Sequence, residues 1–349
     1  MSEFRPTCPD CDDQPTNVDR RDFLRSAAIA GTAVVAGAAP VWAVAKKASK
    51  KKSKPESVVK LLYGSLTDAQ KKEVAFAWDH QDKSRGLLRT RISNNWRITK
   101  PAINSAFYTG EQQQMIRDIY EGIFSPEWVG KMDKQLKDDA GGFGKSQGIA
   151  LFGDPSKGKF EFVMTGRHMT IRCDGNSEDH VAFGGPIFYG HAARGFNEKP
   201  DHPGNVFWHQ AVAANKLYQM LSGKQQKQAL ESNTPREQKV PFQGAKGDFL
   251  GIPIADLAAD QKEHMQKVLK ILIEPYRKSD QDEVVKCLAA QGGLDKCHLA
   301  FFSDKDIGND KVWDNWRLEG PAFVWHFRGA PHVHAWVNVA DDSAVKLNA

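Results

Sequence analysis

One helix-start pattern occurs four times along the chain and limits the folds it can adopt. In each copy an apolar or aromatic residue precedes Thr, Ser or Ala, and Gln follows three positions later. Such a pair can bind the free backbone N–H groups at a helix N-terminus, so each copy predicts a helix start. The copies are Leu66-Thr67-Asp68-Ala69-Gln70, Tyr108-Thr109-Gly110-Glu111-Gln112, Leu221-Ser222-Gly223-Lys224-Gln225 and Leu257-Ala258-Ala259-Asp260-Gln261.

Strand-like segments follow the helical ones. They are short alternating or apolar runs separated by Gly, Pro, Asp and Asn, which predicts an antiparallel meander. The runs in the first half are 149–152, 160–165, 168–173 and 181–189.

The C-terminal region repeats this pattern loosely. Residues 300–304 resemble residues 150–154, and residues 316–320 resemble residues 162–166. We therefore expect an α+β fold with helices packed on antiparallel β-meanders, as two loosely repeated helix-plus-meander halves whose sheets pack or join. Chance similarity between hairpins is the alternative.

Histidines near the C-terminus indicate a metal site. His332 and His334 flank Val333 in a strand-like segment, and residues two apart on a strand point to the same face. A third ligand must come from elsewhere, and His168 after Gly166-Arg167 is the best candidate. Three neutral imidazoles suit zinc, copper, iron or nickel. The alternative is a structural role, with the histidines bonded to backbone along a groove.

Further candidate site residues lie in a long Gly-rich segment and in the last strands. His191, Arg194 and Glu198 are candidates for substrate contact, and His191 also for a fourth metal ligand. Arg328, like Arg194, is a candidate for binding an anionic substrate group. Glu319 is a candidate carboxylate ligand for iron, and Glu198 or Glu319 is a candidate general base for a hydrolase.

Two aromatic groups suggest surroundings for such a site. Trp316, Trp325, Trp336 and Tyr189 would form a dry apolar shell. Residues 93–97 (Ser-Asn-Asn-Trp-Arg) read either as a pocket loop or as a surface turn.

The N-terminus has the order of features expected of a twin-arginine signal peptide. Arg20-Arg21-Asp22-Phe23-Leu24-Arg25 precedes an apolar run at 27–45, which ends in an A-x-A cleavage site. We expect a signal peptide at 1–45, a Lys-rich linker at 46–57 and a single α+β domain at 58–349. The protein would then be periplasmic or secreted, with the twin-arginine translocase as a partner and no stable membrane span after processing.

Charge and cysteines restrict the other classes of function. The net charge of +5 comes largely from the linker lysines, so the composition predicts no nucleic-acid partner. Cys8 and Cys11 would be removed with the signal peptide. Cys287 and Cys297 could close a short loop as a disulfide in an oxidising compartment, and Cys173 would be a buried small hydrophobe.

With these residues in place, the chain resembles a bacterial family catalogued as a domain of unknown function, number 3500 in that series. The resemblance covers roughly residues 60–340. It depends on the helix starts, on Gly166-Arg167-His168, on Gly185-Pro186-x-Phe188-x-Gly190, and on Gly320-Pro321 followed by His332-x-His334-x-Trp336. It implies no activity, and no role for the additional histidines His191, His209 and His326.

The leading hypothesis is an exported metalloprotein, a metal-dependent oxidoreductase that uses copper or iron on a small-molecule substrate. Export in the folded state favours a redox metal. The alternatives are a zinc-dependent hydrolase with the same ligands, or a non-catalytic ligand-binding protein with an aromatic groove.

Overall fold

The computed structural model describes residues 54–192, 205–237 and 240–348. The predicted signal peptide, most of the predicted linker, and Cys8 and Cys11 lie outside the described residues. Among the described residues, no helix has the length and apolar character needed to cross a membrane.

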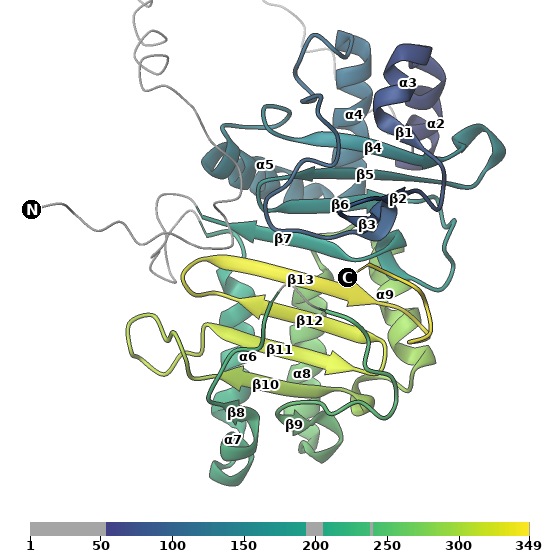
Figure 1. The fold of residues 1–349 in the computed structure, drawn as a ribbon. Coiled ribbons are helices and arrows are strands. Elements are labelled where there is room, and N and C mark those ends of the chain that lie inside the picture. The colour runs from purple at the N-terminus through teal and green to yellow at the C-terminus, as the bar shows by residue number, and fades with distance from the viewer. Residues whose placement is uncertain (1–53, 193–204, 238–239, 349) are drawn as a thin grey trace, which may run out of the picture. The chain divides into compact units, whose positions relative to one another are not determined.

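Most strands belong to one mixed sheet (Figure 1). Its order is β1-β4-β5-β6-β7-β13-β12-β11-β10-β8, and β9 pairs with β10. β2 (Gln81–Asp82) and β3 (Gly86–Leu87) form a separate hairpin. The strands of the large sheet are β1 (Ala75–Phe76), β4 (Gly148–Gly153), β5 (Phe160–Gly166), β6 (Met169–Cys173), β7 (Ile187–His191), β8 (Leu230–Glu231), β9 (Ile252–Pro253), β10 (His298–Phe302), β11 (Asn315–Gly320), β12 (Phe323–Arg328) and β13 (Val333–Val339).

The described residues also form α-helices, and all four predicted helix starts are confirmed. They begin α3, α4, α7 and α8. At Thr67, Thr109 and Ser222 the cap is reciprocal, while Ala258 lacks the hydroxyl and keeps only the bond from its N–H to Gln261. The helices are α2 (Pro55–Ser65), α3 (Asp68–Val74), α4 (Gly110–Ile123), α5 (Pro126–Ala140), α6 (Trp208–Met220), α7 (Gly223–Ala229), α8 (Ala259–Ile273) and α9 (Lys278–Ala290).

The cap glutamines also join helices in pairs. Gln70 Nε2 donates to Gln112 Oε1 at 2.8 Å, which links the starts of α3 and α4. Gln225 Nε2 donates to Gln261 Oε1 at 3.1 Å, which links the starts of α7 and α8 in the same way. The repeated sequence pattern therefore serves a repeated helix contact as well as a local cap.

The predicted two-half organisation is confirmed, and the repeat is closer than the sequence indicated. Apart from the hairpin β2–β3 in the first half and the short strand β9 in the second, the order α2-α3-β1-α4-α5-β4-β5-β6-β7 is matched by α6-α7-β8-α8-α9-β10-β11-β12-β13. The two sheets join edge to edge through antiparallel pairing of β7 with β13.

Strand register shows the same equivalence residue by residue. Gly148 pairs with Thr165 in the first half, as His298 pairs with Glu319 in the second. The outermost pairs also correspond, because Ala75 lies beside Leu151 as Leu230 lies beside Phe301. The halves are thus related by an approximate twofold rotation, with the pair Ile187–Val337 at its centre.

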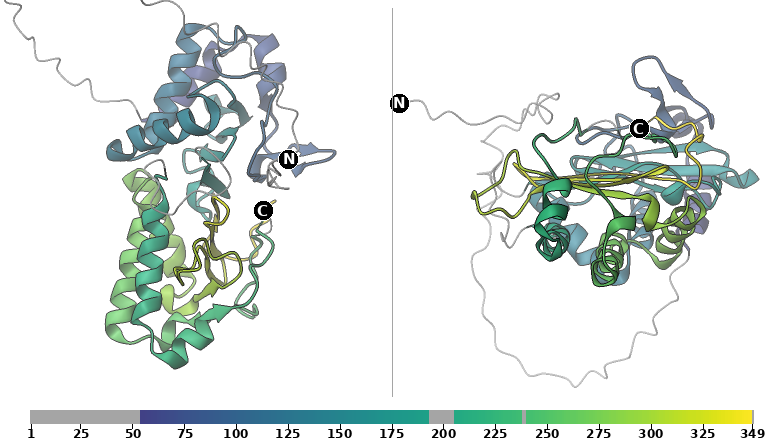
Figure 2. Two further views of the ribbon diagram at one scale, coloured as in Figure 1. Left: turned by 90° about the vertical axis from the view of Figure 1, so that its left-hand side faces the viewer. Right: turned by 90° about the horizontal axis from the view of Figure 1, so that it is seen from below.

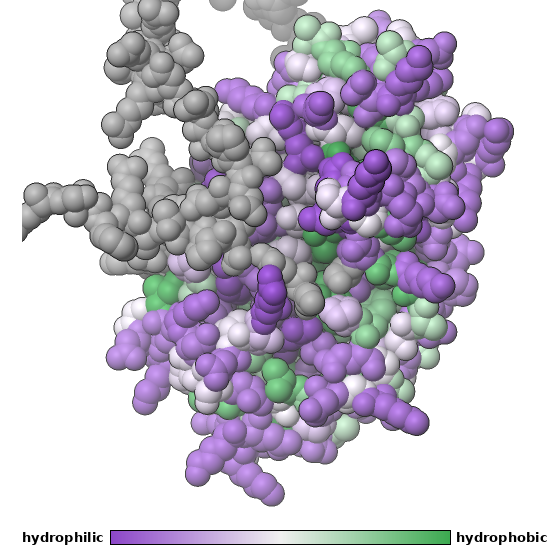
Figure 3. Space-filling model, in the orientation of Figure 1, coloured by the Kyte–Doolittle hydropathy of each residue, from purple (hydrophilic) through white to green (hydrophobic). Residues whose placement is uncertain are grey.

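The two faces of the sheet differ in chemistry. The helices cover one face (Figure 2), where alternate strand residues such as Val333, Ala335 and Val337 join the largest apolar core. The opposite face is covered by loops, and we call it the loop face. It buries charged side chains, including Glu161, Arg172 and Arg328. The loops present a mainly hydrophilic exterior on the side seen in Figure 3.

The predicted disulfide between Cys287 and Cys297 is wrong, because both are free thiols, as is Cys173. Cys297 Sγ packs against Gly320 of β11 and lies 3.9 Å from the Gly293 carbonyl oxygen, whereas Cys287 lies on the buried side of α9. Burial raises the pKa of each of these two thiols to about 12, so neither is a reactive thiolate at neutral pH.

Candidate metal centre

His332 and His334 come from the start of β13. His334 pairs with Gly190 of β7, at the seam between the two halves. Alternation along the strand puts His332, His334 and Trp336 on the loop face, while Val333 and Ala335 enter the core under the helices. His332 and His334 are both buried, with exposed fractions of 2% and 0%.

His168 comes from the two-residue turn between β5 and β6. Its backbone φ is +53°, which is uncommon for a residue other than glycine, and its N–H donates to the Asn94 carbonyl oxygen at 2.8 Å. Trp96 Nε1 also donates to Thr170 at 3.0 Å. Residues 93–97 therefore pack against this turn, and Asn94 is buried rather than part of a surface turn.

Gly190 provides the space in which His168 and His334 meet across β7. A Cβ atom at Gly190 would lie 2.4 Å from the Val333 carbonyl oxygen and 3.3 Å from Cβ and Cγ of His168. Any larger residue at 190 would therefore collide with both β13 and the histidine.

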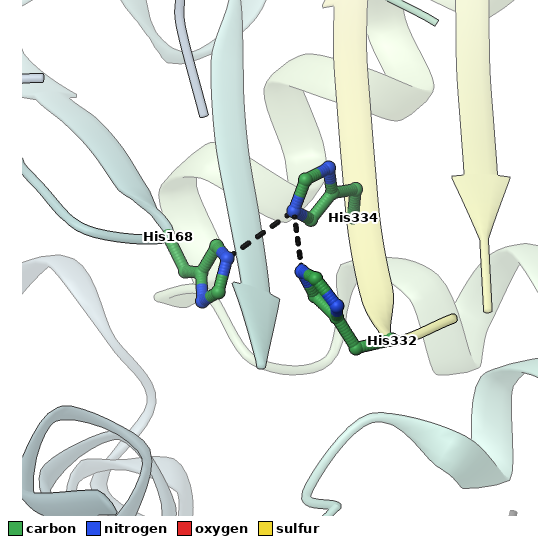
Figure 4. Close-up of side chains that lie close together, drawn as sticks. All are labelled: His168, His332 and His334. Carbon is green, nitrogen blue, oxygen red and sulfur yellow. Dashed lines mark hydrogen bonds between the residues drawn. The ribbon is translucent and has the colours of Figure 1, made fainter. Parts of the chain in front are cut away.

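The three histidines converge through their Nε2 atoms (Figure 4). His334 Nε2 lies 3.0 Å from His332 Nε2 and 3.2 Å from His168 Nε2. All three ligand atoms lie within 4.8 Å of one another. Nitrogens bound to one metal at about 2.0–2.1 Å in a tetrahedral arrangement would be separated by about 3.4 Å. The buried group can therefore hold a metal ion.

Two carboxylates orient two of these rings. His168 Nδ1 lies 2.9 Å from Asp139 Oδ2, at the end of α5. His334 Nδ1 lies 3.2 Å from Glu237 Oε2, in the loop after β8. An ionised carboxylate only accepts hydrogen bonds, so each Nδ1 carries the proton and each Nε2 presents its lone pair. This is the usual second layer around metal-bound histidines.

The electrostatics favour neutral imidazoles. Burial lowers the pKa of His168, His332 and His334, and the positive charge of Arg328 lowers each further. Burial alone would raise the pKa of Asp139, but the neighbouring His168 outweighs it and holds that pKa at about 2. The site thus combines lone-pair donors with an ionised carboxylate beside them.

Arg328 is the one predicted catalytic residue that the structure places beside the histidines. It is the cross-strand partner of His334, and its Nη1 forms an ion pair with Glu237 Oε1 at 3.1 Å. Arg194 and Glu198 lie outside the described residues.

His191 is buried but is not part of the three-histidine group. It pairs with Val333, so alternation directs its side chain to the helix-covered face, opposite to His334. Its role as a fourth ligand remains a prediction.

Several expected neighbours lie elsewhere. Glu319 binds Arg317 Nη2 at 2.9 Å and Gln243 Nε2 at 3.0 Å, and it pairs with Val324 rather than with a residue next to His334. Trp325 donates to the Tyr189 hydroxyl at 2.9 Å. Together with Trp316 these two belong to the core under the helices. Of the predicted aromatic shell, only Trp336 shares the site's face, where it donates to Glu237 at 3.3 Å.

Sequence reasoning missed Asp139, Glu237 and the spacing role of Gly190. Asp139 and Glu237 sit among many charged residues in a helix end and a loop, without a distinctive local pattern. A glycine within a strand is a signal for close approach of another group, and Gly190 could have been identified in this way.

No curated protein and no solved structure matched this chain significantly. A family model described as "Protein of unknown function (DUF3500)" matches residues 48–340. The chain therefore belongs to the DUF3500 family of proteins of unknown function.

Proposed function

We propose that His168, His332 and His334 bind one transition-metal ion and that the protein is an exported, metal-dependent oxidoreductase. The observation that carries the proposal is the convergence of three buried Nε2 atoms, two of them on rings held by carboxylates. Bound there, a copper or iron ion would supply the redox chemistry, and the chain would fix its geometry and exclude water.

Among redox metals, the donor set favours copper. Non-haem iron enzymes of the facial-triad type use two histidines and one carboxylate, whereas this group consists of three imidazoles. Glu319, the carboxylate considered for iron, is bound to Arg317 and Gln243.

A zinc-dependent hydrolase is the second candidate, and a specific feature supports it. Catalytic zinc often takes three protein ligands and leaves one position for water or substrate. Histidine ligands backed by carboxylates, as in the pairs His168–Asp139 and His334–Glu237, are typical of such sites. Export of the folded protein is the reason to rank a redox metal first.

Export itself is part of the proposal and depends on the sequence of residues 1–45. It would place the mature protein in the periplasm or outside the cell, after passage through the twin-arginine translocase. Replacing Arg20 and Arg21 by Lys should leave the precursor inside the cell.

The deciding experiment is metal analysis of the mature protein isolated from the periplasm, beside a His168→Gly variant. Glycine suits the positive φ at 168, so this variant removes a ligand without straining the turn. His298→Gln, which changes a histidine at the far strand β10, is the matched control.

We expect about one copper or iron ion per chain in the wild type and in His298→Gln, and none in His168→Gly. Zinc lost in the same way would select the hydrolase. Absence of metal from the wild type, or full retention in His168→Gly, would overturn the metal site and favour a non-catalytic binding protein. A His191→Asn variant run in the same series tests the fourth ligand.

A further inference from the structure

Arg328 lies next to the three histidines on the same face of the sheet. Cross-strand pairing with His334 places the two side chains side by side. Arg328 is 5% exposed, so its guanidinium is out of contact with bulk water. Its ion pair with Glu237 uses Nη1.

The other edge of this guanidinium is unused. Nε and Nη2 of Arg328 are buried and have no hydrogen-bond partner among the described residues. These two nitrogens form the edge that donates two parallel hydrogen bonds to a planar two-oxygen acceptor. A buried donor left without an acceptor is costly, so such an edge in a folded protein points to a ligand.

Arg172 shows how the same fold treats a buried arginine that has a purely structural role. It lies on the loop face in the other half, and all three of its nitrogens have acceptors. Nε donates to the Pro186 carbonyl oxygen at 2.6 Å, Nη1 to Glu161 at 2.9 Å, and Nη2 to the Arg91 carbonyl oxygen at 2.8 Å. Nε alone also lacks a partner in Arg89, Arg91, Arg167 and Arg317, but among the described arginines only Arg328 has both Nε and Nη2 buried without one.

The charges around Arg328 favour an anion. Two carboxylates lie at the site: Asp139 is paired with His168, and Glu237 is paired with His334 and Arg328. A divalent metal ion and Arg328 together carry three positive charges against the two negative charges of these carboxylates, which leaves one net positive charge. His326, two residues away on the same face, is also fully buried, and neither of its ring nitrogens is bonded to a described residue.

We propose that the substrate of the metal site carries a carboxylate, which Arg328 binds through Nε–H and Nη2–H. This inference rests on the proposed metal function and adds the class of substrate. Arg328 acts as a binding residue that holds the acid group while the rest of the molecule reaches the metal.

The test uses the full mature protein loaded with Co²⁺, whose visible spectrum reports both metal binding and changes at the open coordination position. Formate and acetate are titrated at constant ionic strength, with sulfate and chloride as comparison anions. Arg328→Lys keeps the charge beside Glu237 but removes the two-donor edge. Arg89→Lys, a buried arginine paired with Glu161 in the other half, is the matched control.

We expect formate and acetate to alter the spectrum of the wild type and of Arg89→Lys, with binding about tenfold weaker in Arg328→Lys. Equal binding in Arg328→Lys, or no carboxylate binding to a cobalt-loaded wild type, would overturn this inference and leave the metal site intact. Sulfate or chloride binding as tightly as formate would overturn the assignment to carboxylates. Failure of the wild type to take up Co²⁺ would overturn the proposed function and this inference together.

Discussion

The two halves of the sheet have one architecture and different chemistry at equivalent positions. The shared register equates the turn residue His168 with Ala322. Tyr189 pairs with Met169 in the first half as Val339 pairs with Phe323 in the second. Counting back along the chain from these two residues equates His332 and His334 with Ala182 and Gly184. Three small residues therefore stand where the other end of the molecule carries three imidazoles.

The supporting residues differ in the same way. Asp139 is the second-last residue of α5, and the corresponding position in α9 is Ala289. The segment 182–184 forms a 3-10 turn instead of continuing a strand, and Ala322 packs with Val181 and Ala340 in a small apolar cluster. The scaffold thus supplies two equivalent places, and only one contains both ligands and a carboxylate to orient them.

The largest expected effect comes from closing the space at Gly190, whose counterpart in the other half is Ala340. In Gly190→Ala the added methyl group would collide with β13 and His168, which should lower the free energy of unfolding by about 1–3 kcal/mol and abolish metal binding. Urea unfolding of metal-free protein and metal analysis measure the two effects. Gly130→Ala on α5, where nothing lies within 4 Å, is the control and should keep its metal. Normal stability and metal content in Gly190→Ala would show that the spacing is irrelevant.

A smaller effect is expected from Asp139→Asn, which makes the site more like the equivalent place, where Ala289 stands. The neutral amide of Asn accepts a weaker hydrogen bond from His168 Nδ1 than the Asp139 carboxylate does. The metal affinity should therefore fall by about 10–100-fold. Competition with a chelator of known affinity measures this change. The neighbouring Asp138, which pairs with Lys134 near the surface, gives the control Asp138→Asn. Equal affinities in the two variants would deny Asp139 its orienting role.

Local patterns in the sequence predicted the elements well, since helix caps and strand alternation depend on neighbouring residues. The four Gln-containing helix starts, the meanders and the two-half repeat all follow from such patterns, and so does the grouping of His332 with His334. His168 is predicted as the third ligand from its place after Gly166-Arg167. The positions of the other candidate site residues depend on the pairing register between strands that are far apart in the sequence. This register places Glu319 away from the cluster and directs His191 to the helix-covered face. Asp139 and Glu237 reach the histidines from a helix end and a loop that local patterns cannot position.

The smallest expected effect concerns the equivalent place around Ala182 and Gly184, which lacks the three imidazoles. Glu283 of α9 accepts the Phe183 N–H at 2.9 Å, and burial, with repulsion from Asp174, raises the pKa of this carboxyl to about 8 from 4.5. The folded state therefore holds a proton that the unfolded chain releases above pH 4.5, so stability falls as the pH rises from 4.5 to about 8. A glutamine side chain does not titrate, so Glu283→Gln should lose about 1 kcal/mol less stability than the wild type between pH 6 and pH 8. The effect is no larger because solvent contact screens part of it.

Urea midpoints at pH 6 and pH 8 measure this difference between the wild type and Glu283→Gln. Asp282→Asn, which changes an exposed carboxylate paired with Lys278, is the control and should follow the wild type. Burial lowers the pKa of the clustered histidines, so their contribution to stability is lost in the opposite direction, as the pH falls below about 6.5. If Glu283→Gln and the wild type lose stability in parallel between pH 6 and pH 8, the alkaline response does not come from Glu283. If they diverge, Glu283 makes this end of the scaffold lose stability as the pH rises, with the sign opposite to that expected for the buried imidazoles at the equivalent end.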